Sequence, residues 1–491
     1  MQSGSNCLVT SNSDTYFSMK YSILHISDIH KAQNVSYDAL LQTLERDLVN
    51  FTENEGIVKP SFVVISGDII QGAHKDEEIR TQYAEAEDFL NKLCKLYLNN
   101  DKERLIIVPG NHDVNRARSK ASMKESTSTP EESCKSYFEG SSKIRWSWKD
   151  FKFHEIQNQA LYNSRFEIFI EFYNRFYNGI RCFPNDPEHE AYCVRNDKYK
   201  VLFACFNSCH QLDDLCVTGS IPEEAVFSVG NELNDSNNSG YLNIAVWHHH
   251  FYGSPLTTNY MDRSFLTYLL NANVHIGLFG HQHYAQVAEE YTDLELYKDE
   301  YLQKLLLISS GTLFGGSKEL APGQNRQYNI IEIEPSNGNA KVSISIREDR
   351  NPRKGNLIPF WHAKALQTAD NRITRDVRLR TLSIDKQILE IDKKLRIDND
   401  FVSACESVSM LDFDSDTKYK LWFKYLSNVE DPVYVYSKLQ HVRRVEEAIL
   451  KITAAMKIGN PEFFQELLQD SSIVDLNDSN VNGLLDIIRR Q

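Results

Sequence analysis

Short apolar runs alternate with longer amphipathic segments over much of this chain. Residues 21–27 form the first run, and residues 37–51 follow with leucines at helical spacing. The pair recurs at residues 62–65 and 79–98, and a third apolar run occupies residues 105–108. Short apolar runs predict buried strands, and apolar residues three or four positions apart predict amphipathic helices. The alternation therefore predicts a layered α/β fold.

The same pattern continues beyond residue 200. Further strands are expected at residues 201–206, 242–247, 274–279, 301–309, 327–334 and 341–346, with helices near 222–229 and 262–270. Gly315-Gly316 and a turn over residues 335–338 separate the last three strands. We therefore expect one α/β domain over residues 21–350, preceded by a flexible extension over residues 1–20.

Residues 114–200 interrupt this pattern with an insertion that is rich in aromatic side chains. Over residues 161–177 the aromatics recur at helical spacing, which is typical of a helix face packed in a core. The alternative is a cap that selects substrates by shape or by stacking on a base.

Residues 351–491 differ in character, because glycine becomes scarce and charged helical segments dominate. Helical periodicity is present at residues 384–395, 418–426, 432–456 and 461–468. We expect a separate helical domain. It is either a small bundle docked on the α/β domain or a module for partner binding or self-association.

Composition narrows the class of protein. The chain of 491 residues has 68 acidic and 54 basic residues, a formal net charge of -14. This balance argues against broad affinity for nucleic acid, which depends on Lys and Arg. It does not exclude a local basic cleft. Nine irregularly spaced cysteines argue against a disulfide framework. With no apolar run of about 18 residues and no signal-like start, a cytoplasmic protein is expected.

Four short polar motifs each follow a predicted strand. They are Asp28-Ile29-His30, Gly67-Asp68, Gly110-Asn111-His112-Asp113 and Gly280-His281-Gln282-His283, and the run His248-His249-His250 lies between the last two. In open α/β sheets ligands bind beyond the carboxyl ends of strands, so these side chains are expected to meet. Carboxylate, amide and imidazole groups together favour a site for two divalent metals.

A two-metal site needs a carboxylate that bridges cations about 3.5 to 4 Å apart, and Asp68 is the candidate. Asp28, His30 and a distant histidine are expected to complete the first metal. The second metal is expected to share Asp68 with the first and to bind Asn111, His248 and His281 in addition. Because side chains alternate along an extended segment, His281 and His283 project to one side and can serve different metals.

Two choices in this assignment depend on local sequence. His248 is preferred as the ligand because it comes first after its strand, with His249 as the fallback and His250 as a bystander. Gly67, Gly110, Gly280 and Gly311 are expected to relieve the backbone where it turns sharply beside the ions.

These motifs, in this order, resemble the calcineurin-like metallophosphoesterase superfamily over residues 21–350. Gly280-His281-Gln282-His283, the histidine run and Tyr328-Asn329-Ile330-Ile331 resemble its branch of cyclic-nucleotide and other phosphodiesterases. The resemblance implies a four-layer αββα sandwich and a binuclear centre whose metal-bridging hydroxide attacks phosphorus in line. Mn, Fe, Zn and Ni all suit such a centre, and Mn is favoured.

The resemblance also implies roles for individual residues. It assigns His283 to the first metal, together with Asp28, His30 and Asp68. His112 is expected to face the leaving group as a general acid or charge stabiliser, a role worth about 10² to 10⁴ in rate. Asp113 is expected to orient His112.

One departure from the superfamily is informative. The protein serine/threonine phosphatase branch has a second Asp and an Arg after its Gly-Asp motif, whereas Gly67-Asp68 continues here as Ile69-Ile70-Gln71-Gly72. Protein phosphatase activity is therefore disfavoured. Arg116 and Arg118, just past the third motif, are either a phosphate clamp or solvated loop arginines.

The sequence thus predicts a metal-dependent phosphodiesterase or phosphatase acting on a nucleotide-like or small phosphorylated substrate. Two alternatives stay open. One is a DNA or RNA nuclease working with a partner in repair or defence, because the same motifs resemble the exonuclease subunit of double-strand-break repair complexes. The other is a regulatory scaffold whose helical domain recruits a partner while its metal site is vestigial.

Overall fold

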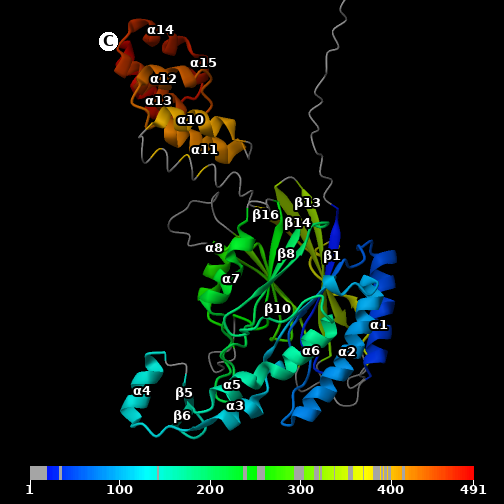
Figure 1. Ribbon diagram of the computed structural model, residues 1–491. Coiled ribbons are helices and arrows are strands. Elements are labelled where there is room, and N and C mark those ends of the chain that lie inside the picture. Colours follow the sequence, from blue (N-terminus) through cyan, green and yellow to red (C-terminus); the bar gives the residue numbers. More distant parts are fainter. Residues whose placement is uncertain are drawn as a thin grey trace, which may run out of the picture. The chain divides into compact units, whose positions relative to one another are not determined.

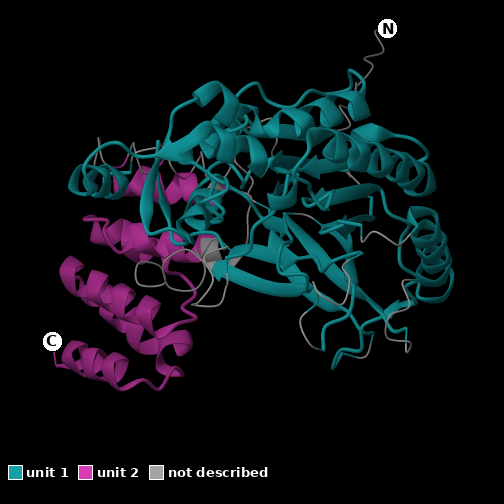
Figure 2. Cartoon of the chain, turned by 90° about the horizontal axis from the view of Figure 1, so that it is seen from below, with its two compact units in different colours: residues 1–380 teal, residues 381–491 magenta. Residues whose placement is uncertain are grey.

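Figure 1 shows a computed structural model of the chain. It describes residues 19–31, 36–140, 143–235, 240–251, 260–291, 304–314, 320, 323–336, 338–351, 358–368, 370–379, 388, 391, 395, 400–411 and 415–490. The predicted extension over residues 1–20, the pair Gly315-Gly316 and the helix at 384–395 lie wholly or mostly outside these residues. Two compact units comprise residues 1–380 and 381–491 (Figure 2). Among the described helices, none has the length and apolar character of a membrane span.

Two large β-sheets form the first unit. The seven-stranded sheet has the order β15 (Trp361–Ala363), β14 (Asn339–Asp349), β13 (Gln327–Ser336), β1 (Tyr21–Ile26), β2 (Phe62–Ser66) and β3 (Leu105–Val108), with β16 (Ile373–Arg378) also paired to β14. The six-stranded sheet has the order β11 (Gln286–Tyr291), β12 (Lys304–Ser309), β10 (Ile276–Phe279), β9 (Leu242–Val246), β8 (Val201–Cys205) and β7 (Tyr192–Asn196). Pairing is parallel from β1 through β3 and from β8 through β9, β10 and β12. The carboxyl ends of these strands therefore share one edge.

Helices cover the outer face of each sheet (Figure 1). On the seven-stranded sheet lie α1 (Tyr37–Val49), a π-helical turn (Asn50–Asn54), α2 (Asp76–Leu98) and α6 (Glu167–Tyr177). On the six-stranded sheet lie α7 (Glu223–Leu233) and α8 (Ser264–Asn271). Between the sheets, Ile23 and Val64 of one pack with Phe203 and Ile244 of the other. The predicted four-layer αββα sandwich is confirmed.

The predicted insertion has its own small structure. Its elements are α3 (Arg116–Ser122), β4 (Met123–Glu125), α4 (Pro130–Phe138), β5 (Ile144–Ser147), β6 (Lys152–Ile156), α5 (Gln159–Asn163) and a 3-10 turn (Ser164–Phe166), followed by α6. Phe169, Phe172 and Phe176 of α6 are buried in the core of the first sheet, so the packed-helix interpretation is confirmed for this segment. Trp148 and Phe151, in contrast, are 74% and 71% exposed on the β5–β6 hairpin.

The boundary of the α/β domain lies later than the predicted residue 350. Strands β15 and β16 both pair with β14, with Trp361 opposite Asp349 and Ile373 opposite Ile344. The sequence did not indicate β16, because four of its six side chains are exposed and three are charged. The sheet therefore extends to Arg378, and the first unit ends at residue 380.

The second unit is helical, with its own hydrophobic core. Its helices are α10 (Phe401–Met410), α11 (Ser415–Leu426), α12 (Pro432–Lys438), α13 (Val445–Ile458), α14 (Pro461–Gln469), α15 (Ser471–Val474) and α16 (Ser479–Arg489). One helix was predicted over residues 432–456, but the structure has two. Glu447 accepts the backbone N–H groups of Arg443 and Arg444, which caps a new helix at that point.

Candidate metal centre

Loops that follow strands of both sheets meet at one edge of the sandwich. Two of them are joined directly, because Asp28 N donates to Gly67 O over 3.1 Å and Ile29 N donates to Asp68 O over 2.8 Å. Asp28 and Asp68 both have a left-handed φ, 51° and 55°, which turns the chain sharply where each strand ends. The seven predicted metal ligands all lie at this edge: Asp28, His30, Asp68, Asn111, His248, His281 and His283.

Asp28, His30 and His283 form the first group of ligand-type side chains, with donor atoms within 4.8 Å of one another. His283 Nε2 lies 3.2 Å from Asp28 Oδ1. His30 Nε2 lies 3.8 Å from Asp28 Oδ1 and 3.9 Å from Asp68 Oδ2. Both of the latter distances exceed a hydrogen bond. The His30 nitrogen therefore faces the space between two carboxylates, as a metal ligand would.

Asp28, Asp68 and His248 form a second group within the same 4.8 Å limit. His248 Nε2 lies 3.3 Å from Asp68 Oδ2 and 3.1 Å from Asn111 Oδ1. His281 Nδ1 lies 2.9 Å from Asn111 Oδ1 and 3.3 Å from His248 Nε2. Asp68 thus faces ligand-type groups on both sides, which is the position predicted for a bridging carboxylate.

His30 supplies a test of whether these residues fit a metal. Both of its ring nitrogens are buried and have no hydrogen-bond partner within the described part of the chain. Buried polar atoms are nearly always satisfied, so such a pair requires an explanation. A divalent cation at Nε2 provides one, since imidazole, carboxylate and amide groups are donors that transition metals accept. The donor set present fits a divalent metal.

The three consecutive histidines differ in their contacts. His248 Nδ1 lies 2.8 Å from Ser66 O, so this nitrogen donates and leaves the lone pair of Nε2 for a metal. His249 Nδ1 lies 2.9 Å from Ser208 Oγ, and burial holds the pKa of His249 well below its usual value. The ring of His250 is buried and belongs to none of the metal-type groups among the described residues. His248 is therefore the member that faces the carboxylates.

Glycines allow the loops to approach one another. Gly67 has a φ of 94°, which favours glycine. A Cβ on Gly110 would lie 2.2 Å from Asp68 Oδ1, and one on Gly280 would lie 2.7 Å from Asp28 Oδ2. Of the four glycines where a sharp turn was predicted, Gly67 alone has a left-handed φ. Gly110, Gly280 and Gly311 instead allow close packing, against Asp68, Ser27 and Gln327 respectively.

His112 lies at the rim of the cluster. Its Nδ1 lies 2.8 Å from Gln71 O, which fixes the ring and makes that nitrogen the donor. The ring stacks on His30 at 4.8 Å between centroids, and Nε2 lies 4.0 Å from Asp68 Oδ2. Its side chain is one-third exposed, at 33%. His112 therefore has one nitrogen held by the backbone and the other directed toward the cluster, where a substrate can reach it.

Asp113 does not orient His112 as predicted. Its carboxylate accepts the backbone N–H of Gly110 at 2.8 Å and of Ile69 at 3.3 Å, and the hydroxyl of Tyr83 at 2.9 Å. Burial, followed by repulsion from Asp68, raises the pKa of Asp113 to about 7. Asp113 fixes the backbone of two ligand-bearing loops, and the Gln71 carbonyl takes the role expected of it toward His112.

The two arginines after the third motif differ. Arg118 forms ion pairs with Asp76, at 2.6 Å, and with Glu167, so its charge is already neutralised. Arg116 is half-buried, and its positive charge contributes to the lowered pKa of His249. Arg118 is therefore the less suited of the two arginines to contact a phosphate.

The charged groups of the site shift one another's pKa values. Burial alone would raise the pKa of Asp28, but His283 holds it well below its usual range. Burial would also raise the pKa of Asp68, but His248 and His112 lower it. In return, Asp68 raises the pKa of His248 to about 9 against the opposing effect of burial. The carboxylates stay ionised, and a cation that binds here displaces protons from the histidines.

Several supporting groups were not found from the sequence. The carbonyls of Ser66 and Gln71 leave no sequence signal, because every residue has a backbone carbonyl. Tyr83 occupies only a helical core position in the sequence, and Thr312, which donates to Asp28 O at 2.7 Å, follows a strand without a motif. Only the periodicity of α2 could have placed Tyr83 toward the sheet.

An αββα sandwich with Asp, Asn and His side chains gathered at the carboxyl ends of its strands defines a metal-dependent phosphoester hydrolase. The family model of the calcineurin-like phosphoesterases matches residues 21–285, more than half of the chain. The chain belongs to this family. Its members bind divalent metals, and the groups at this edge could hold them.

Comparison with individual proteins adds little detail. No curated protein matches the chain. Vps29 from Chaetomium thermophilum is 7% identical, with a TM-score of 0.26, over 73% of this chain and 98% of that one. The calcineurin-like phosphoesterase YfkN from Bacillus subtilis is 11% identical, with a TM-score of 0.28, over 74% and 94%.

Proposed function

We propose that this protein is a cytoplasmic phosphodiesterase that hydrolyses a nucleotide-like substrate with two divalent cations, Mn²⁺ being favoured. The observation that carries the proposal is the position of Asp68, whose Oδ2 lies 3.3 Å from His248 Nε2 and 3.9 Å from His30 Nε2. One carboxylate thus faces both groups of ligands. Two cations bound there supply Lewis acidity and lower the pKa of a water molecule, which provides the nucleophile.

The other residues of the site have matching roles. Asn111 offers a neutral amide oxygen, which adds no negative charge against a phosphate. Arg116 attracts the phosphate through its positive charge. In its imidazolium form His112 keeps the Nδ1 proton on the Gln71 carbonyl and transfers the Nε2 proton to the leaving oxygen, which leaves the ring neutral. Together these groups bind the phosphoester, neutralise its charge and protonate the leaving group.

Phosphodiesters are favoured over phosphoproteins as substrates. Residues 69–72 lack the second Asp and the Arg that the protein phosphatase branch has after its Gly-Asp motif. In their place the Gln71 carbonyl holds His112. Residues 381–491 form a separate helical unit without a metal-type cluster among its described residues, and we assign it to partner binding or self-association.

A nuclease that works with a partner is the second candidate. The observation in its favour is the β5–β6 hairpin, where the exposed rings of Trp148 and Phe151 flank Lys149. Aromatic and basic side chains in this order suit stacking and backbone contacts to a single strand.

One substrate panel tests both candidates. Metal-stripped protein is reloaded with Mn²⁺, Fe²⁺, Zn²⁺ or Ni²⁺ and assayed on bis-p-nitrophenyl phosphate, cyclic nucleotides, dinucleotides, phosphomonoesters and single-stranded and linear DNA. The proposal expects hydrolysis of the small diesters that depends on added metal. Cleavage of DNA alone would favour the nuclease, and no hydrolysis with any metal would contradict both.

A further inference from the structure

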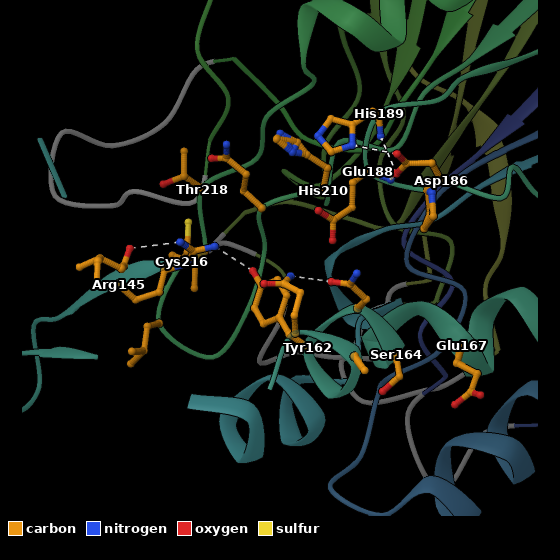
Figure 3. Close-up of a pocket in the computed structure, with 18 of the residues that line it drawn as sticks. Arg145, Tyr162, Ser164, Glu167, Asp186, Glu188, His189, His210, Cys216 and Thr218 are labelled. Atoms are coloured by element: carbon orange, nitrogen blue, oxygen red, sulfur yellow. Dashed lines mark hydrogen bonds and ion pairs between the residues drawn. The ribbon is translucent and has the colours of Figure 1, made fainter. Parts of the chain in front are cut away.

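A second feature of the first unit is a cavity of about 1120 Å³ between the insertion and the loop after β8. In Figure 3, His189 and His210 lie on one side of it, Arg145 and Cys216 on another, and Tyr162 between them. Its volume slightly exceeds the range of about 300 to 1,000 Å³ that is usual for small-molecule sites, so it has room for a substrate group. None of the predicted metal ligands lines it. The cavity is thus separate from the metal centre.

One loop separates the cavity from the metal centre. His210 and Thr218 of this loop line the cavity. Two residues before His210, Ser208 Oγ lies 2.9 Å from His249 Nδ1. Directly after Thr218 comes Gly219, where a Cβ would lie 2.2 Å from His249 Cγ. Since two residues of extended chain span at most about 7 Å, the cavity and the metal centre are neighbours across this loop.

Most charged side chains of the cavity wall are held in ion pairs. These pairs are Glu167 with Arg118, Glu171 with Arg80 at 2.9 Å, Glu188 with Arg165 at 2.8 Å, and Arg145 with Asp213 at 2.6 Å. The arginine that lines the cavity, Arg145, is thus already bound to a carboxylate, so an anionic group of a ligand finds no unpaired guanidinium there. The cavity therefore suits an uncharged part of the substrate rather than its phosphate.

Flat rings and amides make up much of the remaining wall. Trp146 and Trp148 contribute aromatic surface, and Asn185 and Gln211 contribute side-chain amides. Aromatic rings stack on bases, and amides both donate and accept hydrogen bonds at base edges. An uncharged, planar ring system with polar edges meets both features, and a nucleobase has this chemistry.

We propose that this cavity binds the nucleobase end of the substrate while the phosphoester lies at the metal centre. The proposal rests on the proposed function in one respect, that the substrate is a phosphodiester. In this arrangement the charged phosphate stays with the metals, and the neutral base enters the cavity across the loop that includes Ser208 and Gly219.

Tryptophan fluorescence tests the cavity without any reaction. Each of the four ribonucleosides is titrated into the full-length protein, and stacking on Trp146 or Trp148 is expected to quench the emission. Trp148→Ala and Gln211→Ala are expected to weaken binding at least tenfold. Phe138→Ala is the matched control, because Phe138 is 80% exposed on the same insertion and does not line the cavity. Equal quenching in all variants, or none by any ribonucleoside, would overturn the proposal.

Kinetics separate this proposal from the proposed function. With Mn²⁺ present, Gln211→Ala is expected to raise KM for adenylyl-(3′→5′)-adenosine at least tenfold and to leave hydrolysis of bis-p-nitrophenyl phosphate, which has no base, unchanged. An equal loss on both substrates would contradict a base pocket. If the wild-type protein hydrolyses neither diester but ribonucleosides still quench its fluorescence, the proposed function fails and the cavity stands.

Discussion

The hydroxyl of Tyr83 on α2 donates to Asp113 Oδ1 at 2.9 Å. The same carboxylate accepts Gly110 N and Ile69 N, so one buried side chain joins a helix of the outer layer to two ligand-bearing loops. The ring of Tyr83 stacks on Phe172 of α6, at 4.7 Å between centroids. Helix α6 of the insertion thus holds Tyr83 in place, and Tyr83 holds the Asp113 carboxylate that fixes the two ligand-bearing loops.

Above about pH 8, where Asp113 with its pKa of about 7 is ionised, Tyr83→Phe is expected to destabilise the protein by about 1.5 to 3 kcal/mol, because it removes a buried hydrogen bond to a charged group. Tyr97→Phe is the matched control, since the Tyr97 hydroxyl donates to the neutral Leu44 O at 3.3 Å, and a loss of about 0.5 to 1.5 kcal/mol is expected there. Urea denaturation measures both. Equal losses would mean that the Asp113 contact has no special weight.

Asp68→Ala and Asn111→Ala are expected to abolish Mn²⁺-dependent hydrolysis of bis-p-nitrophenyl phosphate while circular dichroism stays unchanged. Each change removes a donor that faces His248. Asp88→Ala, on an exposed position of α2, serves as the control and is expected to retain full turnover. Undiminished turnover in either site variant contradicts the bimetal assignment.

His112→Ala is expected to lower kcat by about 10² to 10⁴ without emptying the site, because His112 serves the leaving group rather than a metal. Metal content per chain, measured by atomic emission, is the second readout. A protein that loses its metal along with its activity would show that His112 is a ligand. That result is worth testing for, since His112 Nε2 lies 4.0 Å from Asp68 Oδ2.

Gly110→Ala is expected to lower metal affinity and turnover, because its Cβ would lie 2.2 Å from Asp68 Oδ1 and must displace that carboxylate. Gly230→Ala is the matched control. It lies within α7 with open space around the added methyl group, so a gain of up to about 1 kcal/mol in stability is expected. Isothermal titration with Mn²⁺ distinguishes them, and unaltered affinity in Gly110→Ala would argue against the close contact.

Stability is expected to fall as the pH drops from 6.5 toward 3. Burial lowers the pKa of His210 to about 3, whereas in the unfolded chain it titrates near 6.5. Between these values the unfolded state binds a proton that the folded state excludes, so stability rises with pH. At pH 5 the cost is at most about 2 kcal/mol. Urea titrations at pH 5 and 7.5 should show a smaller pH dependence for His210→Gln, and an identical dependence would refute this.

The sequence was most informative where chemistry and secondary structure coincide. Asp28, Asp68, Asn111, His248 and His281 each directly follow an apolar strand, so strand prediction alone brought them to one edge. Strand pairing that depends on residues far away in the sequence could not be predicted in this way. The exposed, charged β16 belongs to the sheet only because β14 lies beside it.

The same distinction applies to individual side chains near the site. The sequence could not separate Arg116 from Arg118, because both follow the third motif. The difference arises from Asp76 and Glu167, which reach Arg118 from two other helices. Likewise, Asp113 adjoins His112 in sequence, yet its carboxylate is occupied by Tyr83 and backbone amides. Contacts between distant segments decide such roles.

The candidate ligands come from both sheets of the sandwich. Asp28, Asp68 and Asn111 follow strands of the seven-stranded sheet, whereas His248, His281 and His283 follow strands of the six-stranded one. A bound cation therefore cross-links the two halves of the hydrophobic core, and the sheets cannot separate without releasing it. At a free metal concentration 100 times the Kd, this linkage adds about 2.7 kcal/mol to the free energy of unfolding. Metal supply is therefore expected to change the stability of the folded chain as well as its turnover.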